Sequence, residues 1–139
     1  MPTAQTGQDE RLTMTFFSSF GAGDARAMLA DMIAHASLER LHAIAQLHEA
    51  GVSVTDAERA LASKKAEILR TVDPKDLGSN AETRNANVIE MCAVQIASLE
   101  DARRTLDRAR YEMECQDNTK RMLRELRIVL IGPDGEFNN

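Results

Sequence analysis

The stretch that decides the fold is residues 80–131, NAETRNANVIEMCAVQIASLEDARRTLDRARYEMECQDNTKRMLRELRIVLI. It contains no glycine or proline, and the next ones are Gly132 and Pro133. Asn80 is a favourable N-cap. Apolar residues then follow at steps of four and three, the spacing of a coiled-coil seam; they are Cys92, Ile96, Leu99, Ala102, Leu106, Ala109 and Met113. The stretch predicts one very long C-terminal helix, about 75 Å long if straight.

The apolar pattern of this helix is interrupted at residues 114–121, ECQDNTKR, and resumes at Met122, Leu126 and Val129. The second stripe is rotated relative to the first. The interruption therefore predicts a bend, a loop or a change of packing partner.

Two shorter helices are predicted before it. The first begins at the N-cap Asp24 and ends at Gly51, so it covers residues 24–50. Its apolar stripe consists of Leu29, Ile33, Ala36, Leu41, Ile44 and Leu47. The second covers residues 55–71, because residues 55–58 (TDAE) form a capping box and Pro74 follows its end.

The composition supports an all-α fold. The chain has 139 residues, enough for one domain, and only 4% of them are aromatic. We expect an elongated antiparallel helical hairpin or three-helix bundle with coiled-coil character. The single helical domain covers residues 13–131, between a flexible segment at 1–12 and an irregular tail at 132–139.

Self-association is expected from the lengths of these helices. The two shorter helices together are no longer than the third, so apolar side chains near its end would extend beyond their cover. The predicted interface of a homo-oligomer consists of Met122, Leu123, Leu126, Val129 and Leu130.

The aromatic residues cluster at 13–20, TMTFFSSF, which contains Phe16, Phe17 and Phe20. Two interpretations stay open. The segment closes one end of its own bundle, which is the favoured interpretation, or it anchors a partner.

No constellation with catalytic or cofactor chemistry is present in the sequence. His35, Glu39 and His42 share one helix face, but no second helix supplies a matching Glu-x-x-His, so we predict a solvated face and no metal site. Cys92 lies on the apolar seam, and Cys115 has acidic neighbours that keep a thiol protonated. We therefore expect no enzymatic activity.

Basic residues recur along the C-terminal half of the long helix. They are Arg103, Arg104, Arg108, Arg110, Lys120, Arg121, Arg124 and Arg127. Such residues could contact a nucleic-acid backbone or another anion. Acidic residues are interleaved with them, which is more typical of an exposed helix with paired charges.

Charge and processing signals narrow the class of protein. The formal net charge is −5, unlike that of a duplex-DNA binder, and the polar first ten residues show no secretory signal. The longest apolar run, residues 128–131, is too short to span a bilayer. Cys92 and Cys115 would lie about 34 Å apart on one straight helix, too far to form a disulfide. We expect a cytoplasmic protein that does not bind membranes.

Residues 66–86, AEILRTVDPKDLGSNAETRNA, resemble the turn of small helical-hairpin accessory proteins of tailed phages and prophages. The matching features are Gly78, Asn80, Glu82 and Arg84, between an alanine- and glutamate-rich helix and a helix rich in Glu and Arg. The resemblance covers about residues 58–130. It implies an accessory, non-catalytic role.

The functional expectation is a non-enzymatic accessory protein of phage or mobile-element type. It would act by binding a host or phage protein, such as a host defence or DNA-processing factor. The alternatives are a single-stranded nucleic-acid or nucleotide binder in a recombination module, and a virion or scaffold component. Nucleic acid is the less favoured partner, because aromatic residues for base stacking are scarce.

Overall fold

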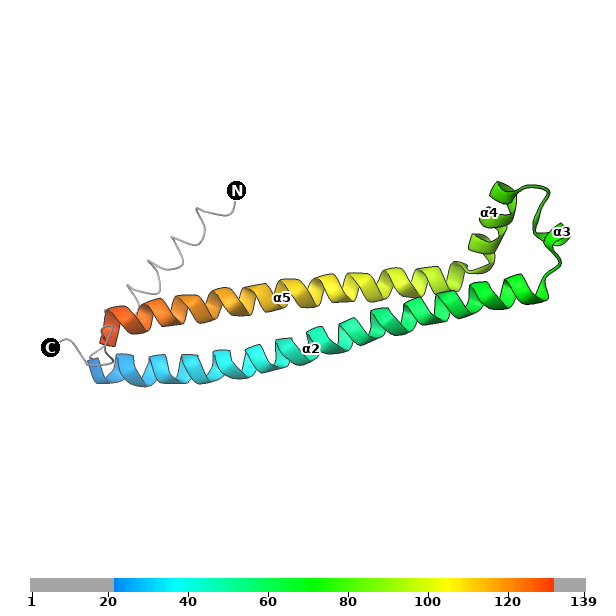
Figure 1. The fold of residues 1–139 in the computed structure, drawn as a ribbon. Coiled ribbons are helices and arrows are strands. Elements are labelled where there is room, and N and C mark those ends of the chain that lie inside the picture. Colours follow the sequence, from blue (N-terminus) through cyan, green and yellow to red (C-terminus); the bar gives the residue numbers. More distant parts are fainter. Residues whose placement is uncertain (1–21, 132–139) are drawn as a thin grey trace. The chain divides into compact units, whose positions relative to one another are not determined.

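A computed structural model describes residues 22–131, and all regular secondary structure in that part of the chain is helical (Figure 1). The elements in chain order are α2 (Ala22–Thr71), α3 (Pro74–Leu77), α4 (Ala81–Met91) and α5 (Ala93–Ile131). The predicted all-α helical hairpin with a long C-terminal helix is confirmed. The expectations for residues 1–20 and 132–139 lie outside the described residues. No helix in the described part is both long and apolar enough to span a membrane.

The chain divides into two compact units. Unit 1 consists of residues 1–43 and 113–139, and unit 2 consists of residues 44–112. Within each unit, a part of α2 packs along an antiparallel part of α5 (Figure 1). Each unit has its own hydrophobic core.

The core of unit 1 joins the first turns of α2 to the last turns of α5. Ala25 and Leu29 of α2 pack with Leu123 and Leu126 of α5, and all four are at most 6% exposed. Partly buried side chains surround them; these are Met28, Met32, Ala36, Met122 and Leu130. Because the apolar residues recur at steps of three and four on both helices, one face of each helix meets the other along its length.

The core of unit 2 joins four elements. Ile68 of α2, Leu77 of α3, Val88 of α4 and Cys92 form a buried cluster. Leu61, Val72 and Ile96 are packed against it. The cluster fixes the turn between the long helices, because it takes residues from both sides of that turn.

The predicted helix end at Gly51 is wrong. Residues 24–50 and 55–71 belong to the single 50-residue helix α2. Gly51 is not a left-handed cap, since Gly78 is the only described glycine with positive φ. Thr55 Oγ1 donates a hydrogen bond back to the Gly51 carbonyl oxygen at 3.1 Å instead of capping a new helix. Buried Ala50 and half-buried Val54 continue the inward-facing seam, so tertiary packing outweighs the glycine's low helix propensity.

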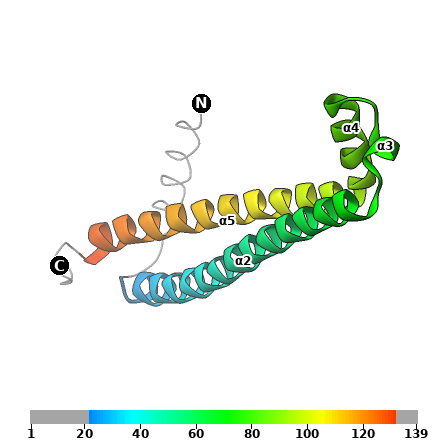
Figure 2. The ribbon, with the colours of Figure 1, turned by 45° about the vertical axis from the view of Figure 1, so that its right-hand side comes forward.

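The predicted uninterrupted helix over residues 80–131 is also wrong, because it breaks at Cys92. Cys92 has φ −98° and ψ 11°, and α4 turns away from the direction of α5 at this residue (Figure 2). Its side chain is fully buried in the unit 2 core. Val88 and Cys92, which lie on α4 and at the break, both pack in the same cluster as Leu77. The break is therefore associated with packing in the unit 2 core. No glycine or proline marks the position.

The interruption at residues 114–121 does not break α5. The helix is continuous from Ala93 to Ile131. Half-buried Gln116 and Thr119 occupy the seam there in place of apolar residues. The sequence pattern changes because this layer of the seam is polar.

The turn between α2 and α4 is held by side-chain caps. Asp73 Oδ1 accepts a hydrogen bond from the Lys75 backbone N–H at 3.0 Å, and Asn80 Oδ1 accepts one from the Thr83 backbone N–H at 2.8 Å. Arg84 Nε donates to the Gly78 carbonyl oxygen at 3.0 Å. Gly78, Asn80 and Arg84, three of the residues in the phage-type resemblance, thus all serve the turn.

Candidate functional site

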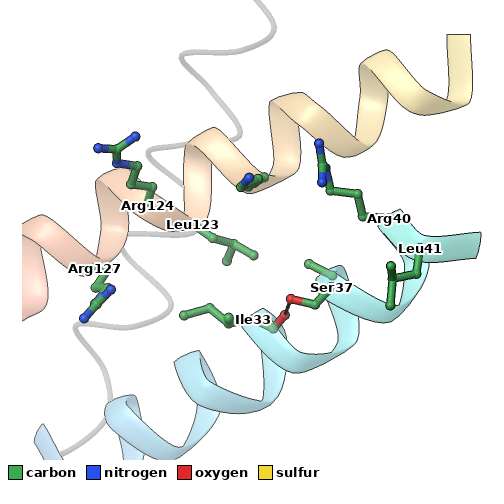
Figure 3. A pocket seen from close by; sticks show the side chains of 9 residues that line it. Ile33, Ser37, Arg40, Leu41, Leu123, Arg124 and Arg127 are labelled. Atoms are coloured by element: carbon green, nitrogen blue, oxygen red, sulfur yellow. Dashed lines mark hydrogen bonds between the residues drawn. The ribbon is translucent and has the colours of Figure 1, made fainter. Parts of the chain in front are cut away.

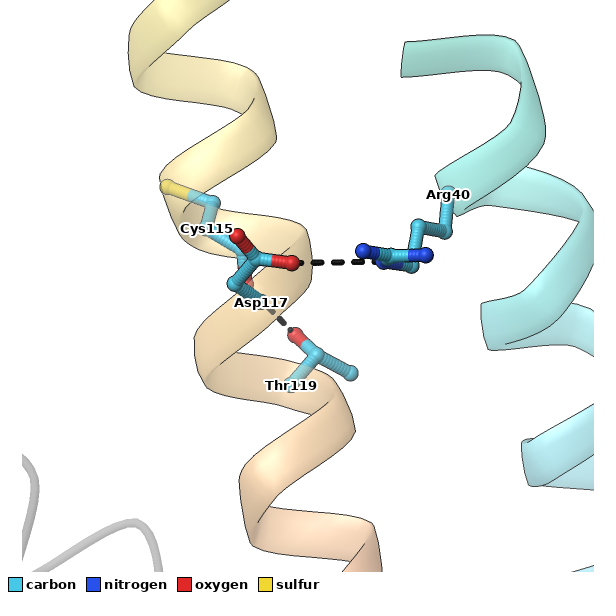
Figure 4. Close-up of polar contacts among 4 residues, drawn as sticks. All are labelled: Arg40, Cys115, Asp117 and Thr119. Carbon is cyan, nitrogen blue, oxygen red and sulfur yellow. Dashed lines mark hydrogen bonds and ion pairs between the residues drawn. The ribbon is translucent and has the colours of Figure 1, made fainter. Parts of the chain in front are cut away.

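Unit 1 contains a polar layer in the seam between α2 and α5. Arg40 of α2 reaches across to α5, where its Nε donates to Asp117 Oδ1 at 3.2 Å (Figure 4). On α5, Thr119 Oγ1 donates to the Cys115 carbonyl oxygen at 3.0 Å. The side chains of Arg40 and Asp117 are 36% and 54% exposed. An ion pair this exposed contributes little to stability, but it holds the Arg40 side chain across the seam.

A groove of about 580 Å³ adjoins this layer, between α2 and α5 of unit 1 (Figure 3). Its apolar surface comes from Ile33, Ala36, Leu41 and Leu123. Its polar lining consists of Ser37 and four cationic side chains, which are Arg40, Lys120, Arg124 and Arg127. Both helices therefore supply apolar contacts, and α5 supplies most of the positive charge.

The charge in the groove is largely uncompensated. Arg40 is paired with Asp117. Among residues 22–131, no carboxylate lies within 4.0 Å of the terminal nitrogens of Lys120, Arg124 or Arg127. These three residues are spaced by four and three positions, so they share one edge of α5. In the described part of the chain, no acidic side chain lines the groove.

The structure separates the eight basic residues predicted to contact an anion. Arg103, Arg104, Arg108 and Arg110 belong to unit 2, whereas Lys120, Arg121, Arg124 and Arg127 belong to unit 1.

Three of the four in unit 2 form ion pairs. Arg103 lies 3.5 Å from Glu58, and Arg104 lies 2.8 Å from Asp101. Arg110 lies 3.4 Å from Asp107. The interleaved acidic residues neutralise them, as the sequence pattern indicated.

The basic residues of unit 1 differ. Arg121 donates a hydrogen bond to Asn118 Oδ1 and does not line the groove. Of the four basic residues in unit 1, Lys120, Arg124 and Arg127 line the groove.

The α5 leucines of the predicted oligomer interface do not extend beyond the cover of α2, contrary to expectation. Leu123 and Leu126 are each 4% exposed, and Met122 and Leu130 are partly buried with them. Of the five predicted interface residues, Val129 is the one that is mostly exposed, at 57%. The leucines are covered by α2 of the same chain, so they leave no large apolar surface for a second copy.

Sequence reasoning missed the apolar side of the groove because it placed the α2 residues in one stripe. Leu29, Ala36 and Leu47 are buried or half-buried, whereas Ile33 and Leu41 are 38% and 64% exposed. Only part of this signal was present in the spacing. Inward residues recur in a heptad, and Leu41 falls outside it, but Ile33 shares the heptad position of Leu47 and is exposed all the same.

The remaining candidates for chemistry lie apart from the groove. Cys92 is buried, Cys115 is half-buried, and both are free thiols. His35 Nε2 lies 3.9 Å from Glu39 Oε1 on an exposed helix face. In the described part of the chain, no three His, Cys, Asp or Glu side chains form a group suited to a metal ion.

The fold and the groove define a class, an all-α helical hairpin with an amphipathic, cationic groove between its long helices. No protein-family model matches the chain, and no curated protein or solved structure shows significant similarity to it.

Proposed function

We propose that this protein is a non-enzymatic accessory protein that binds an acidic, amphipathic segment of a partner protein in the unit 1 groove. One observation carries the proposal. Lys120, Arg124 and Arg127 lie beside an exposed apolar surface, and no carboxylate among residues 22–131 lies within 4.0 Å of their terminal nitrogens. Unpaired cations beside exposed apolar side chains match a ligand that has acidic and apolar groups side by side.

A helical segment of a partner suits the shape of this site. The groove runs between two packed helices and is lined from both, so a third helix can lie along it with its apolar face on the exposed side chains of Ile33 and Leu41. Acidic residues on one side of that helix would then meet Arg124 and Arg127. The apolar contact supplies affinity, and the charges favour acidic partners over basic ones.

Single-stranded nucleic acid is the second candidate, because the same three cations could follow a phosphate backbone. Non-specific binders of single strands usually also stack bases on aromatic side chains. Among residues 22–131, no aromatic residue lines the groove, and the one aromatic residue in this range, Tyr111, belongs to unit 2. The lining therefore favours a protein partner.

The resemblance of residues 66–86 to phage-type helical hairpins supports an accessory, non-catalytic role. A cytoplasmic setting and a host defence or DNA-processing factor as the partner are further parts of the proposal. A virion or scaffold role and homo-oligomerisation remain alternatives within the same class. Self-association would need a surface other than the buried leucines of α5.

Fluorescence anisotropy with two probes tests the proposal. The first is a labelled helical peptide of about 18 residues, with leucines along one face and glutamates beside them. The second is a labelled oligo-dT strand. We expect the peptide to bind, and the Arg124→Glu, Arg127→Glu double variant to weaken it about tenfold or more, which is about 1.4 kcal/mol.

The matched control is the Arg104→Glu, Arg108→Glu double variant, which changes the net charge equally but alters unit 2. It should leave the peptide affinity within about twofold, since it does not touch the groove. Equal weakening by both double variants would contradict the proposal. Binding of oligo-dT alone, sensitive to salt and to Arg124 and Arg127, would favour the nucleic-acid candidate.

A further inference from the structure

The groove lies close in sequence to the N-terminal residues of the chain. Residues 1–21 precede α2 directly, and the groove begins at Ile33 of that helix. We propose that residues 9–20 of this chain occupy the groove in cis, so that a partner segment must displace them. The inference uses the same groove as the proposed function but does not depend on the identity of any partner.

The length of the segment is sufficient. From Ala22, the groove residues Ile33 and Leu41 lie about 17 and 29 Å along α2, at about 1.5 Å per residue. The ten residues from Leu12 to Ala22 span up to about 33 Å when extended. A segment that folds back along α2 therefore reaches the whole groove.

The chemistry of the segment complements the groove. Residues 9–20, DERLTMTFFSSF, contain the acidic pair Asp9 and Glu10, one basic residue, Arg11, and then five large apolar side chains, so the segment carries a net charge of −1. The five apolar side chains are Leu12, Met14, Phe16, Phe17 and Phe20. The groove offers uncompensated cations and exposed apolar side chains. The segment thus combines acidic and apolar groups, which are the groups that complement the cationic and apolar side chains of the groove.

The C-terminal tail is the competing segment of the same chain. Residues 132–139, GPDGEFNN, carry two acidic residues but a single large apolar side chain, Phe137. Three phenylalanines bury far more apolar area than one, since each buries about 150–250 Å². The N-terminal segment is therefore the better match to the apolar surface of the groove.

Covalent attachment strengthens such a contact. A segment joined to the groove by a short linker has an effective concentration in the millimolar range, so even a weak intrinsic affinity keeps it bound. A partner in trans then competes with the segment. The apparent Kd of the partner equals its intrinsic Kd divided by the fraction of molecules whose groove is free.

Thiol labelling of the full chain tests this inference. Ser37 lines the groove, so a Ser37→Cys variant, in a Cys115→Ser background, reports on access to it. Cys92 is fully buried and stays unreactive while the chain is folded. We expect the Phe16→Ser, Phe17→Ser double variant to increase the maleimide labelling rate at position 37 about tenfold, because the segment no longer covers that position.

Two controls make the result decisive. A Ser98→Cys variant places the thiol at an exposed site in unit 2, where the phenylalanine substitutions should not change the rate. Phe137→Ser should also leave the rate at position 37 unchanged. An unchanged rate in the Phe16, Phe17 variant would overturn the inference, and so would an increase caused by Phe137→Ser instead.

Protection by a second copy is distinguished by dilution. Cover in cis gives a labelling rate independent of protein concentration, whereas protection that is lost on dilution would also overturn the inference. Failure of this inference leaves the peptide-binding result unchanged. Failure of the proposed function would appear as peptide binding that does not respond to Arg124 and Arg127.

Discussion

Gly78 has a backbone conformation that restricts which residue can occupy its position. It has φ +141°, a conformation that side chains rarely adopt, and it precedes the Asn80 cap of α4. A Cβ atom at this position would lie 2.7 Å from Thr83 Cγ2 and 3.1 Å from the Arg84 backbone nitrogen. Both the positive φ and the lack of room for a Cβ atom therefore favour glycine at position 78.

We expect Gly78→Ala to lower the free energy of unfolding by about 1–3 kcal/mol, through backbone strain and crowding. Urea unfolding followed by far-ultraviolet circular dichroism measures the change. An unchanged midpoint would mean that the turn does not hold this conformation in solution.

Gly51 is the counterpart in the interior of a helix. It is half-buried within α2, and a Cβ atom there would meet nothing within 4 Å apart from its chain neighbours and the backbone of its own helix. We expect Gly51→Ala to raise the free energy of unfolding by about 0.5–1 kcal/mol, because alanine loses less backbone entropy than glycine in a helix. The same urea titration applies. Destabilisation would support the predicted helix end at Gly51, where a left-handed glycine is needed.

At the scale of the elements, the sequence predicted helix type and the inward-facing residues better than helix ends. Steps of three and four residues correctly placed Leu29 and Leu99 in the core. Gly51 and the capping box after it are strong local signals, yet α2 continues through them because packing of Ala50 and Val54 favours the helix. Local signals could not reveal the break at Cys92, which depends on the unit 2 core.

The wrong helix ends at Gly51 and Cys92 also led to the wrong prediction that the α5 leucines are uncovered. With α2 divided and residues 80–131 kept as one helix, the C-terminal end of that helix had no cover. In the structure α2 has 50 residues and α5 has 39, so α2 is the longer helix. The basic rim of the groove was visible in the sequence, but its apolar side on α2 was not, because exposed and buried residues shared one apparent stripe.

Leu126→Ala separates a core role from an interface role. If Leu126 is a core residue, its truncation to alanine should lower the free energy of unfolding by about 2–5 kcal/mol. Val129→Ala, three residues along the same helix and exposed, should cost much less. Urea unfolding together with light scattering checks this. A variant of full stability that lost mass would show instead that Leu126 lies between subunits.

For the whole molecule, the two units divide the chemistry of the chain. Unit 2 holds the capped turn and the paired arginines, which are the features expected of a structural hairpin end. Unit 1 holds the cationic groove and is continuous in sequence with the aromatic N-terminal segment. Partner binding and its competition by residues 9–20 are therefore both assigned to unit 1.

A charge-swap experiment on the groove tests the central claim most directly. The Arg124→Glu, Arg127→Glu variant is titrated with the acidic amphipathic peptide and with a matched peptide whose glutamates are replaced by lysines. If the groove binds by apolar contact and charge complementarity, the original chain prefers the acidic peptide and the variant prefers the basic one, with a reversal of about tenfold or more. An unchanged preference for the acidic peptide in the variant would contradict the claim.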